Sequence, residues 1–333
     1  MSNPGALNKN NIIIPRRYFI RQLGVIAALP LTDKLGKAVV EEIGDDNISL
    51  GYTVPQMSYH IFSKHINWMS FKEMAQLAKR IGFDGIDLTV RKGGLIEPEH
   101  VKTNLPIAVE TIRKEGIDVK CLSTDLGEQD DQHTSDMLST MKDLEITHFR
   151  MKNFHYHAEE TYKQSQKRVF ENFKKLAKRN EKYKIIGSYQ NHSNYNGPGV
   201  AVQPYFGANL LDVYLILSEI ESPYLGMQFD IDHATVEGAY SWKWAFDLIH
   251  PYLTSLHIKD HTFIKGVNGL ECPQVPIGTG LVDYEGFADS VKKFQLKVPV
   301  TFYYGYDIGN KELGLDEAAM FRDLNFLKSI LGA

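Results

Sequence analysis

From residue 48 to its end, the chain alternates short apolar runs with longer amphipathic stretches, and this alternation constrains the fold more than any other feature. Runs that are apolar throughout and are separated by helical patterns predict parallel strands that helices cover. We expect strands at Ile48–Thr53, Gly85–Val90, Asp118–Ser123, Thr147–Met151, Lys184–Tyr189, Tyr224–Phe229, Leu253–Ile258 and Val298–Tyr303.

A helical pattern follows each expected strand. The helices are expected at Phe71–Arg80, Val101–Glu115, Thr134–Leu144, Glu159–Arg179, Asn209–Glu219, Trp242–Ile249, Tyr284–Phe294 and Leu315–Ile330. Eight such units within fewer than about 290 residues fit a closed barrel better than an open sheet. We therefore predict an α/β fold, a (β/α)8 TIM barrel that forms a single domain over residues 47–333. The sequence contains no Gly-x-Gly-x-x-Gly turn and no Walker-type loop, which disfavours dinucleotide and NTP binding.

The N-terminal residues 1–46 carry the pattern of an export signal followed by a linker. The pair Arg16 and Arg17 precedes a short apolar stretch, Leu23–Leu31, as in twin-arginine signals, and small residues allow cleavage after Ala38. The stretch is far shorter than the roughly 20 residues of a membrane span. The pattern predicts a periplasmic or other extracytoplasmic protein, or a cytoplasmic one if the signal is not used. The alternative is a tail with a chance arginine pair.

Charge and cysteine content exclude several partners. The formal net charge of −4 gives no basic surface for a nucleic acid, so we predict no nucleic-acid partner. Cys121 and Cys272 are the only cysteines, which is too few for a cysteine-rich zinc site.

Polar residues gather where the expected strands end. In a barrel of this type, the chemistry lies at the C-terminal ends of the strands and in the loops that follow them. These positions hold Arg91, Asp125, Arg150, Lys152, Gln190, Asn191, His192, Asp230, Asp232, His233, His257, Lys259, Asp260 and His261. A random surface distribution would not concentrate His, Asp and Lys there, so the pattern predicts a functional site.

Three segments resemble the xylose-isomerase-like barrel family of sugar and sugar-phosphate isomerases and epimerases. They are GFDGIDL at Gly82–Leu88, FDIDHA at Phe229–Ala234 and LHIKD at Leu256–Asp260. The resemblance extends from about residue 48 to the C-terminus. It implies an enzyme that acts on a sugar or sugar derivative next to a carbonyl. It also implies one divalent metal ion, bound by Glu, Asp, His and Glu at the ends of strands 5 to 8.

The resemblance implies an altered metal site. Asp230 and His257 match the family's Asp and His, whereas Gln190 replaces one Glu and Gly305 replaces the other. The metal ligands then implied are Gln190, Asp230 and His257, and the ligand charge falls from three carboxylates (−3) to one (−1). Because a unit charge pair at about 4 Å is worth roughly 4 kcal/mol at an effective dielectric near 20, we expect Mn, Zn or Mg to be held weakly or not at all.

The same replacements remove the two glutamates that exchange a proton with the substrate in the family's epimerases. General base catalysis needs a group with an accessible pKa, which Gln and Gly lack. His233, His192 and Lys259 are the predicted catalytic residues instead. The predicted substrate-binding residues are Arg91, Lys152, Tyr156 and Asp232, although Arg91, Lys152 and His192 could equally serve in surface contacts.

The first functional hypothesis is an exported isomerase- or epimerase-like enzyme, or a related lyase, that takes a small-molecule carbohydrate. The alternative is a degenerate barrel that binds carbohydrate without turnover. Gln190 and Gly305 favour the alternative, whereas Asp230, His257 and Lys259 favour an enzyme. DNA repair on the same fold is disfavoured by the acidic net charge and the small number of metal ligands. The resemblance also implies a possible homodimer.

Overall fold

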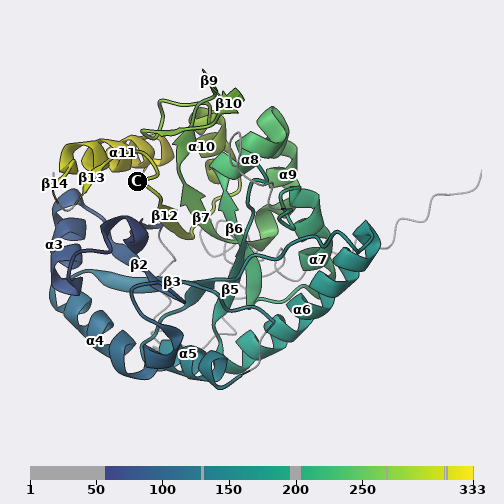
Figure 1. Cartoon of the computed structure of the whole chain (residues 1–333), viewed down its shortest axis with the longest axis horizontal. Helices are drawn as coiled ribbons and strands as arrows, with labels where there is room; N and C mark the ends of the chain where they lie inside the picture. The colour runs from purple at the N-terminus through teal and green to yellow at the C-terminus, as the bar shows by residue number, and fades with distance from the viewer. Residues whose placement is uncertain are drawn as a thin grey trace, which may run out of the picture. The chain divides into compact units, whose positions relative to one another are not determined.

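Eight parallel strands close into a barrel in the computed structural model, which describes residues 57–128, 131–195, 204–267, 269–310, 312 and 314–332 (Figure 1). The barrel strands are β1 Ser58–Phe62, β2 Gly85–Val90, β3 Asp118–Thr124, β4 His148–Arg150, β5 Ile186–Gln190, β6 Leu225–Asp230, β7 Leu253–Ile258 and β12 Pro299–Phe302. Their order around the barrel is β1-β12-β7-β6-β5-β4-β3-β2. The predicted (β/α)8 fold is confirmed.

Helices surround the strands as an outer ring (Figure 1). They are α3 Phe71–Ile81, α4 Val101–Lys114, α5 Gln132–Asp143, α6 Tyr162–Tyr183, α7 Leu210–Ile220, α8 Ile231–Gly238, α9 Trp242–Ile249, α10 Tyr284–Lys293 and α11 Glu317–Leu331. Local sequence fixes several helix starts. Ser70 and Glu73 form a capping box at α3, and Thr161 and Gln164 form one at α6, so that backbone N–H groups without helical partners are bonded.

Several short elements join the strands to the helices. Short 3-10 helices occur at Ser63–Ile66, Pro98–His100, Ala239–Ser241 and His250–Tyr252. Six short strands pair as β8 Asp260–His261 with β11 Gln274–Val275, β9 Ile264–Gly266 with β10 Gly269–Glu271, and β13 Gly309–Asn310 with β14 Gly314–Leu315. All six follow β7 or β12, so the loops after these two barrel strands are elaborated. Among the described helices, none has the length and apolar character to cross a membrane.

The first barrel strand differs from the predicted one. It is Ser58–Phe62, whereas the predicted strand Ile48–Thr53 and the predicted export signal lie outside the described residues. Strand β1 pairs with both β2 and β12, so the barrel closes with Ser58–Phe62 as its first strand. The prediction failed because this strand alternates polar and apolar residues. His60 is buried and contacts the Ser58 hydroxyl at 2.9 Å, which hides the strand from a search for apolar runs.

The apolar core lies between the barrel and its helices. Phe229 on β6 packs edge-to-face on Phe246 of α9 at 4.9 Å between ring centroids and stacks on Phe287 of α10 at 6.3 Å. All three rings are fully buried. Because side chains alternate along a strand, a Phe229 that faces the helices turns Gln228 and Asp230 toward the barrel interior. The core thus fixes the direction of the Asp230 carboxylate.

Candidate functional site

Three predicted residues from neighbouring strands meet at the C-terminal end of the barrel. Asp230 ends β6, Gln190 ends β5, and His257 on β7 is the register partner of Asp230. The Gln190 Nε2 donates to Asp230 Oδ2 at 2.8 Å, and His257 Nδ1 lies 3.0 Å from the same oxygen. The structure therefore brings together the residues that the sequence placed at one barrel mouth.

The second oxygen of Asp230 begins a helix. Asp230 is the N-cap of α8, and its Oδ1 accepts the backbone N–H of His233 at 3.0 Å. This bond satisfies one of the N–H groups left without a partner at a helix start. The cap sets His233 one turn along α8, with its Nε2 3.6 Å from Asp230 Oδ2.

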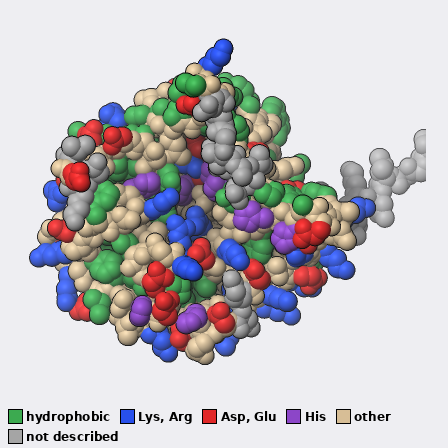
Figure 2. Space-filling view, in the orientation of Figure 1, with side chains coloured by type: hydrophobic (Ala, Val, Ile, Leu, Met, Phe, Trp, Pro, Cys, Tyr) green, Lys and Arg blue, Asp and Glu red, His purple; other side chains and the backbone are tan. Residues whose placement is uncertain are grey.

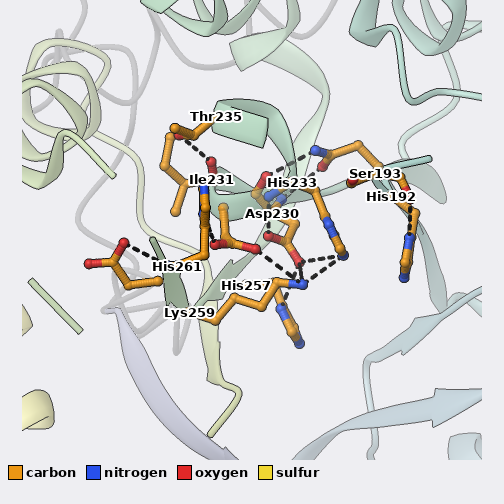
Figure 3. Close-up of polar contacts among 12 residues, drawn as sticks. His192, Ser193, Asp230, Ile231, His233, Thr235, His257, Lys259 and His261 are labelled. Carbon is orange, nitrogen blue, oxygen red and sulfur yellow. Dashed lines mark hydrogen bonds and ion pairs between the residues drawn. The ribbon is translucent and has the colours of Figure 1, made fainter. Parts of the chain in front are cut away.

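The Lys259 ammonium lies at the centre of this cluster (Figure 3). Its Nζ lies 2.6 Å from His233 Nε2, 3.3 Å from Asp230 Oδ2 and 3.5 Å from Asp232 Oδ2. Because an ammonium group only donates hydrogen bonds, His233 Nε2 must accept, and the neutral ring then carries its proton on Nδ1. Lys259 is 5% exposed, so this cation is held inside the barrel mouth.

Asp232 extends the cluster away from the barrel axis. His261 Nδ1 lies 2.5 Å from Asp232 Oδ1, and since a carboxylate accepts, the His261 ring donates this bond. The other ring nitrogen, His261 Nε2, is buried and has no hydrogen-bond partner among the described residues. A chain of charged and polar contacts therefore runs from His261 through Asp232 to Lys259.

Burial and neighbouring charges set the protonation of the cluster. Burial alone would lower the pKa of Lys259, but the carboxylates of Asp230 and Asp232 outweigh it, so the pKa is raised. Burial would raise the pKa of Asp230, but His233, Lys259 and His257 hold it well below its ordinary value. Burial lowers the pKa of His233 well below its ordinary value. At neutral pH the cluster is therefore an ammonium, a carboxylate and a neutral imidazole.

His192 presents a free nitrogen next to this cluster. Its ring lies 3.9 Å from the His233 ring and 4.2 Å from the Tyr205 ring, centroid to centroid. The Nδ1 lies 3.0 Å from the Ser193 carbonyl oxygen, which accepts only, so Nδ1 carries the proton of the neutral ring and Nε2 has a lone pair. Burial lowers the pKa of His192 to about 4.

Sequence reasoning placed Arg150 at a strand end of the predicted site but assigned it no role. Its Nη1 donates to Gln190 Oε1 at 3.1 Å, which fixes the Gln190 amide with its nitrogen toward Asp230. Burial, and next the charge of Arg91, lower the pKa of Arg150 to about 10. Neither arginine forms an ion pair with any residue that the structure describes. The only available signal was the place of Arg150 at the end of β4, because no motif contains it.

Asn191 connects the ends of β5 and β6. Its Oδ1 accepts the backbone N–H of Asp230 at 2.8 Å, and its Nδ2 donates to the Asp230 carbonyl at 2.9 Å. Both groups are buried. The pair of bonds holds the backbone of the residue that carries the central carboxylate.

The side chains of Tyr303 and Gln274 lie near the position where the resemblance implies a Glu at Gly305. The inward-facing residue after β12 is Tyr303, whose ring centroid lies 5.3 Å from Lys259 Nζ and 5.7 Å from the His257 ring. A Cβ at Gly305 would lie 1.5 Å from Gln274 Oε1, so the Gln274 side chain occupies that volume. The Gln274 amide therefore fills the space of a side chain at Gly305, where the resemblance implies a Glu, and the Tyr303 ring faces the cluster from the same strand end.

Asp260 anchors the long loop after β7. Its Oδ1 accepts the backbone N–H of His261 at 2.9 Å and of Val282 at 3.1 Å. Its Oδ2 accepts the N–H of Gly278 at 3.1 Å and of Gly280 at 2.8 Å. One carboxylate therefore binds both ends of the loop.

Two predicted substrate-binding residues contact other partners. Lys152 Nζ pairs with Glu128 at 3.2 Å, and both side chains are exposed. The Tyr156 hydroxyl donates to the Asp212 carboxylate of α7. Among the described residues, no hydrogen bond or ion pair joins either of them to the Lys259 cluster, so their roles stay predictions.

The mouth of the barrel is rich in cationic and imidazole side chains. In Figure 2, Lys, Arg and His side chains gather around a hollow at the centre of the face. Two groups of side chains have the donor types and spacing of metal ligands, with ligand atoms within 4.8 Å of one another. They are Asp230 with Asp232 and His233, and Asp232 with Asp260 and His261.

Comparisons with known proteins agree with this architecture. A family profile described as xylose isomerase-like TIM barrel matches residues 75–329. The probable 3-DHS dehydratase AsbF of Bacillus anthracis is 14% identical over 82% of this chain and 99% of its own, with a TM-score of 0.61. A D-psicose 3-epimerase solved in the presence of D-fructose is 14% identical over 83% of this chain and 100% of its own, with a TM-score of 0.60.

A third similar structure is the 3-keto-D-glucoside 4-epimerase YcjR of E. coli in its apo form. It is 13% identical over 82% of this chain and 100% of its own, with a TM-score of 0.60. At these identities the solved structures show a shared fold. No curated protein sequence matches this chain.

Proposed function

The chain belongs to the xylose isomerase-like TIM barrel family, and we propose that it acts on a sugar or sugar derivative at a carbon next to a carbonyl. The reaction would be an isomerisation, an epimerisation or a related elimination. The observation that carries this proposal is the buried contact of Lys259 with His233 and Asp230 at the barrel mouth. The similar structures named as sugar epimerases and as a dehydratase support the same reaction class.

Lys259 is the electrophile of the proposed reaction. Removing a proton next to a carbonyl places negative charge on the carbonyl oxygen, and a buried ammonium stabilises that charge more strongly than water does. Lys259 donates one N–H to His233 at 2.6 Å and a second to Asp230 at 3.3 Å, whereas Asp232 lies at an ion-pair distance of 3.5 Å. A substrate oxygen can therefore take up a remaining N–H.

His192 is the base of the proposed reaction. Its Nε2 lone pair takes the proton from the carbon, the C–H electron pair forms the enolate, and the charge settles on the oxygen beside Lys259. Return of the proton from His192 to the neighbouring carbon, with a proton passing between the two substrate oxygens, completes an isomerisation. An epimerisation requires a proton donor on the opposite face of the enolate, because return from His192 to the same carbon restores the substrate. The pKa of about 4 keeps His192 neutral at pH 7, as a base requires, though it limits its basicity. His233 is less suited, because its Nε2 already accepts from Lys259.

Arg150 and Arg91 support a substrate that carries an anionic group. Arg150 is half-buried beside Gln190 and, like Arg91, has no ion-pair partner among the described residues. A guanidinium binds carboxylate or phosphate oxygens in pairs, which suits both a sugar acid and a sugar phosphate. We propose that these arginines hold the end of the substrate remote from Lys259.

The donors at the mouth do not fit the divalent ion that the family resemblance implies. The Gln190 amide turns its N–H, not its oxygen, toward Asp230, because Arg150 takes the oxygen. Lys259 Nζ lies within 3.5 Å of a ligand atom on each of Asp230, Asp232 and His233. A divalent ion about 4 Å from this ammonium would be repelled by about 8 kcal/mol at an effective dielectric near 20. The proposed reaction therefore uses side chains alone.

Proton exchange with solvent tests the proposal directly. Neutral ketoses, sugar acids and sugar phosphates are incubated with the protein in D₂O, and ¹H NMR follows loss of the signal next to the carbonyl. We expect exchange with an anionic sugar, lowered by about 10²–10⁴-fold in His192→Gln, as for removal of a general base. His100→Gln, at an exposed histidine, serves as the matched control. The proposal fails if His192→Gln exchanges as fast as the wild type.

The same assay distinguishes between the two functional hypotheses, an enzyme and a barrel that binds carbohydrate without turnover. A sugar that raises Tm without any exchange or conversion would favour the degenerate carbohydrate-binding barrel. Arg150→Met is expected to weaken the binding of anionic sugars and to leave the binding of neutral sugars unchanged. Arg80→Met, which removes an exposed arginine paired with Glu317, is the control for the lost charge.

We also propose export through the twin-arginine pattern of the N-terminus. The sequence Arg16-Arg17 followed by the apolar Leu23–Leu31 supports it. Cell fractionation of the full chain tests the proposal, with a double Arg16→Lys, Arg17→Lys variant as control. Equal distribution of the two proteins between compartments would contradict it.

A further inference from the structure

The Lys259 ammonium has the surroundings of a bound cation. Three ligand atoms of the kinds that bind metals surround it, from Asp230, Asp232 and His233. Figure 3 shows their dashed contacts converging on its nitrogen. The Lys259 ammonium therefore lies at the position between these three ligand atoms where a metal ion would bind.

A second observation indicates a metal-type arrangement around the same carboxylate. His257 Nδ1 lies 3.0 Å from Asp230 Oδ2, yet the buried nitrogen makes no hydrogen bond with any described residue. Two atoms at that separation and without a bond between them are placed like two ligands of one ion, since ligand atoms about 2.0–2.2 Å from a tetrahedral ion lie slightly over 3 Å apart. His257 therefore offers a further donor atom beside Asp230, next to the group of Asp230, Asp232 and His233.

We propose that Lys259 is the resident cation of this site, and that its side chain is what keeps a divalent ion out. Only the catalytic role of Lys259 rests on the proposed function, in which its ammonium stabilises the negative charge on the substrate oxygen. The cation exclusion is a property of the folded protein and does not depend on turnover. Removing the ammonium should leave Asp230, Asp232, His233 and His257 free to bind an ion.

The side chain of Gln190 determines how strong the uncovered site would be. Its amide now bridges Arg150 and Asp230. A carboxylate at position 190 would still accept from Arg150 and would add a second anionic ligand beside Asp230. We therefore expect a Lys259→Met, Gln190→Glu double variant to bind a divalent ion more tightly than Lys259→Met alone.

Metal titration of the purified protein tests this proposal without any substrate. The wild type, Lys259→Met, Lys259→Arg and the double variant are dialysed against Zn²⁺, Mn²⁺ or Mg²⁺, and bound metal and Tm are measured. We expect no stoichiometric ion and no ion-dependent Tm shift in the wild type and in Lys259→Arg, which retains a positive charge. We expect Lys259→Met to gain a Tm rise that grows with the logarithm of ion concentration, and the double variant to gain a larger one.

Two results would overturn the proposal. One is a stoichiometric ion in the wild type, removable by chelation with a fall in Tm. The other is a folded Lys259→Met variant, by circular dichroism, that binds no more ion than the wild type, because the ammonium would then not be the reason for exclusion. If Lys259→Met does not fold, Lys259→Gln replaces it as the neutral variant, with the same two outcomes. Lys293→Met, at an exposed lysine paired with Asp247, is the matched control.

Discussion

At the scale of single residues, one carboxylate organises the whole mouth of the barrel. Asp230 accepts from Gln190 and from the His233 backbone, and it lies 3.0 Å from His257 and 3.3 Å from Lys259. Its side chain is fully buried. The protein therefore depends on Asp230 in two ways: one side-chain oxygen begins α8, and the negative charge offsets the burial of Lys259.

Asp230→Asn separates these two roles. Asparagine caps helices about as well as aspartate, so the start of α8 should survive while Lys259 loses its closest carboxylate. Because an uncompensated buried charge typically costs about 3–5 kcal/mol and Asp232 still faces Lys259 at 3.5 Å, we expect the free energy of unfolding, measured by urea denaturation, to fall by less than this. A Lys259→Met, Asp230→Asn double variant should recover part of the loss.

The exposed pair of Lys293 and Asp247 provides the control for this experiment. Asp247→Asn breaks an ion pair whose side chains are both more than half exposed, and such pairs contribute little. An Asp230→Asn variant as stable as Asp247→Asn would contradict the role given to the buried carboxylate.

Sequence reasoning predicted the meeting of Gln190, Asp230 and His257, because strand order in a barrel places the C-terminal ends of neighbouring strands together. It did not predict that the Lys259 nitrogen would lie between acceptors, since this depends on side-chain direction. It also placed Arg150 at the strand ends without assigning it a role. A single arginine at a strand end belongs to no motif. A role for it can be inferred only from the structure, where it has no ion-pair partner among the described residues.

At the scale of elements, the ends of β5 and β6 are joined by a side chain. The Asn191 side chain donates to the Asp230 carbonyl and accepts from the Asp230 N–H, as the backbone of a neighbouring strand would. Its amide therefore continues the sheet beyond Gln190, the last residue of β5. The position of the Asp230 carboxylate follows from this contact as well as from the packing of Phe229.

Asn191→Ala tests this contact. The substitution removes both side-chain hydrogen bonds to the Asp230 backbone, and each such bond contributes about 0.5–1.5 kcal/mol. We expect a lower free energy of unfolding and faster amide hydrogen exchange at Asp230. Asn104→Ala, at an exposed asparagine of α4, should leave both measurements unchanged. Unchanged exchange at Asp230 in Asn191→Ala would argue against the contact.

Elements with a long periodic pattern were predicted well. Strands β2 and β7 and helix α9 have the predicted bounds, and the other helices differ by a few residues at their ends. The short helix α8 was missed because the family motif FDIDHA was interpreted for its ligands and not for the N-cap that Asp230 provides. The paired short strands after β7 and β12 were missed because two- and three-residue strands depend on tertiary contacts.

At the scale of the whole molecule, buried histidines make the protein sensitive to acid. Burial lowers the pKa of His60 and His65 to about 3 and that of His148 and His192 to about 4. The unfolded chain protonates these rings near their ordinary pKa of about 6.5. Between these values the unfolded state binds more protons than the folded state, so stability falls as the pH falls.

His60→Asn measures one share of this effect. His60 is fully buried in the barrel, and each such ring adds up to about 1.4 kcal/mol of stability per pH unit between its folded and unfolded pKa values. We expect urea unfolding between about pH 7 and pH 5 to show a shallower pH dependence in His60→Asn, by up to that slope. His100→Asn should keep the wild-type slope, and equal slopes in all three proteins would refute the assignment.

The homodimer implied by the family resemblance stays a prediction at this scale. Light scattering of the purified protein over a range of concentrations tests it. A mass of one chain, about 38 kDa, at all concentrations would contradict it.

The long loop after β7 starts and finishes on Asp260, which receives N–H groups from His261, Gly278, Gly280 and Val282. Because both ends of the loop are hydrogen-bonded to the same carboxylate, the loop can change in length and sequence while strand β7 keeps its position. The residues between these contacts can therefore be exchanged, by evolution or by protein engineering, without displacing β7.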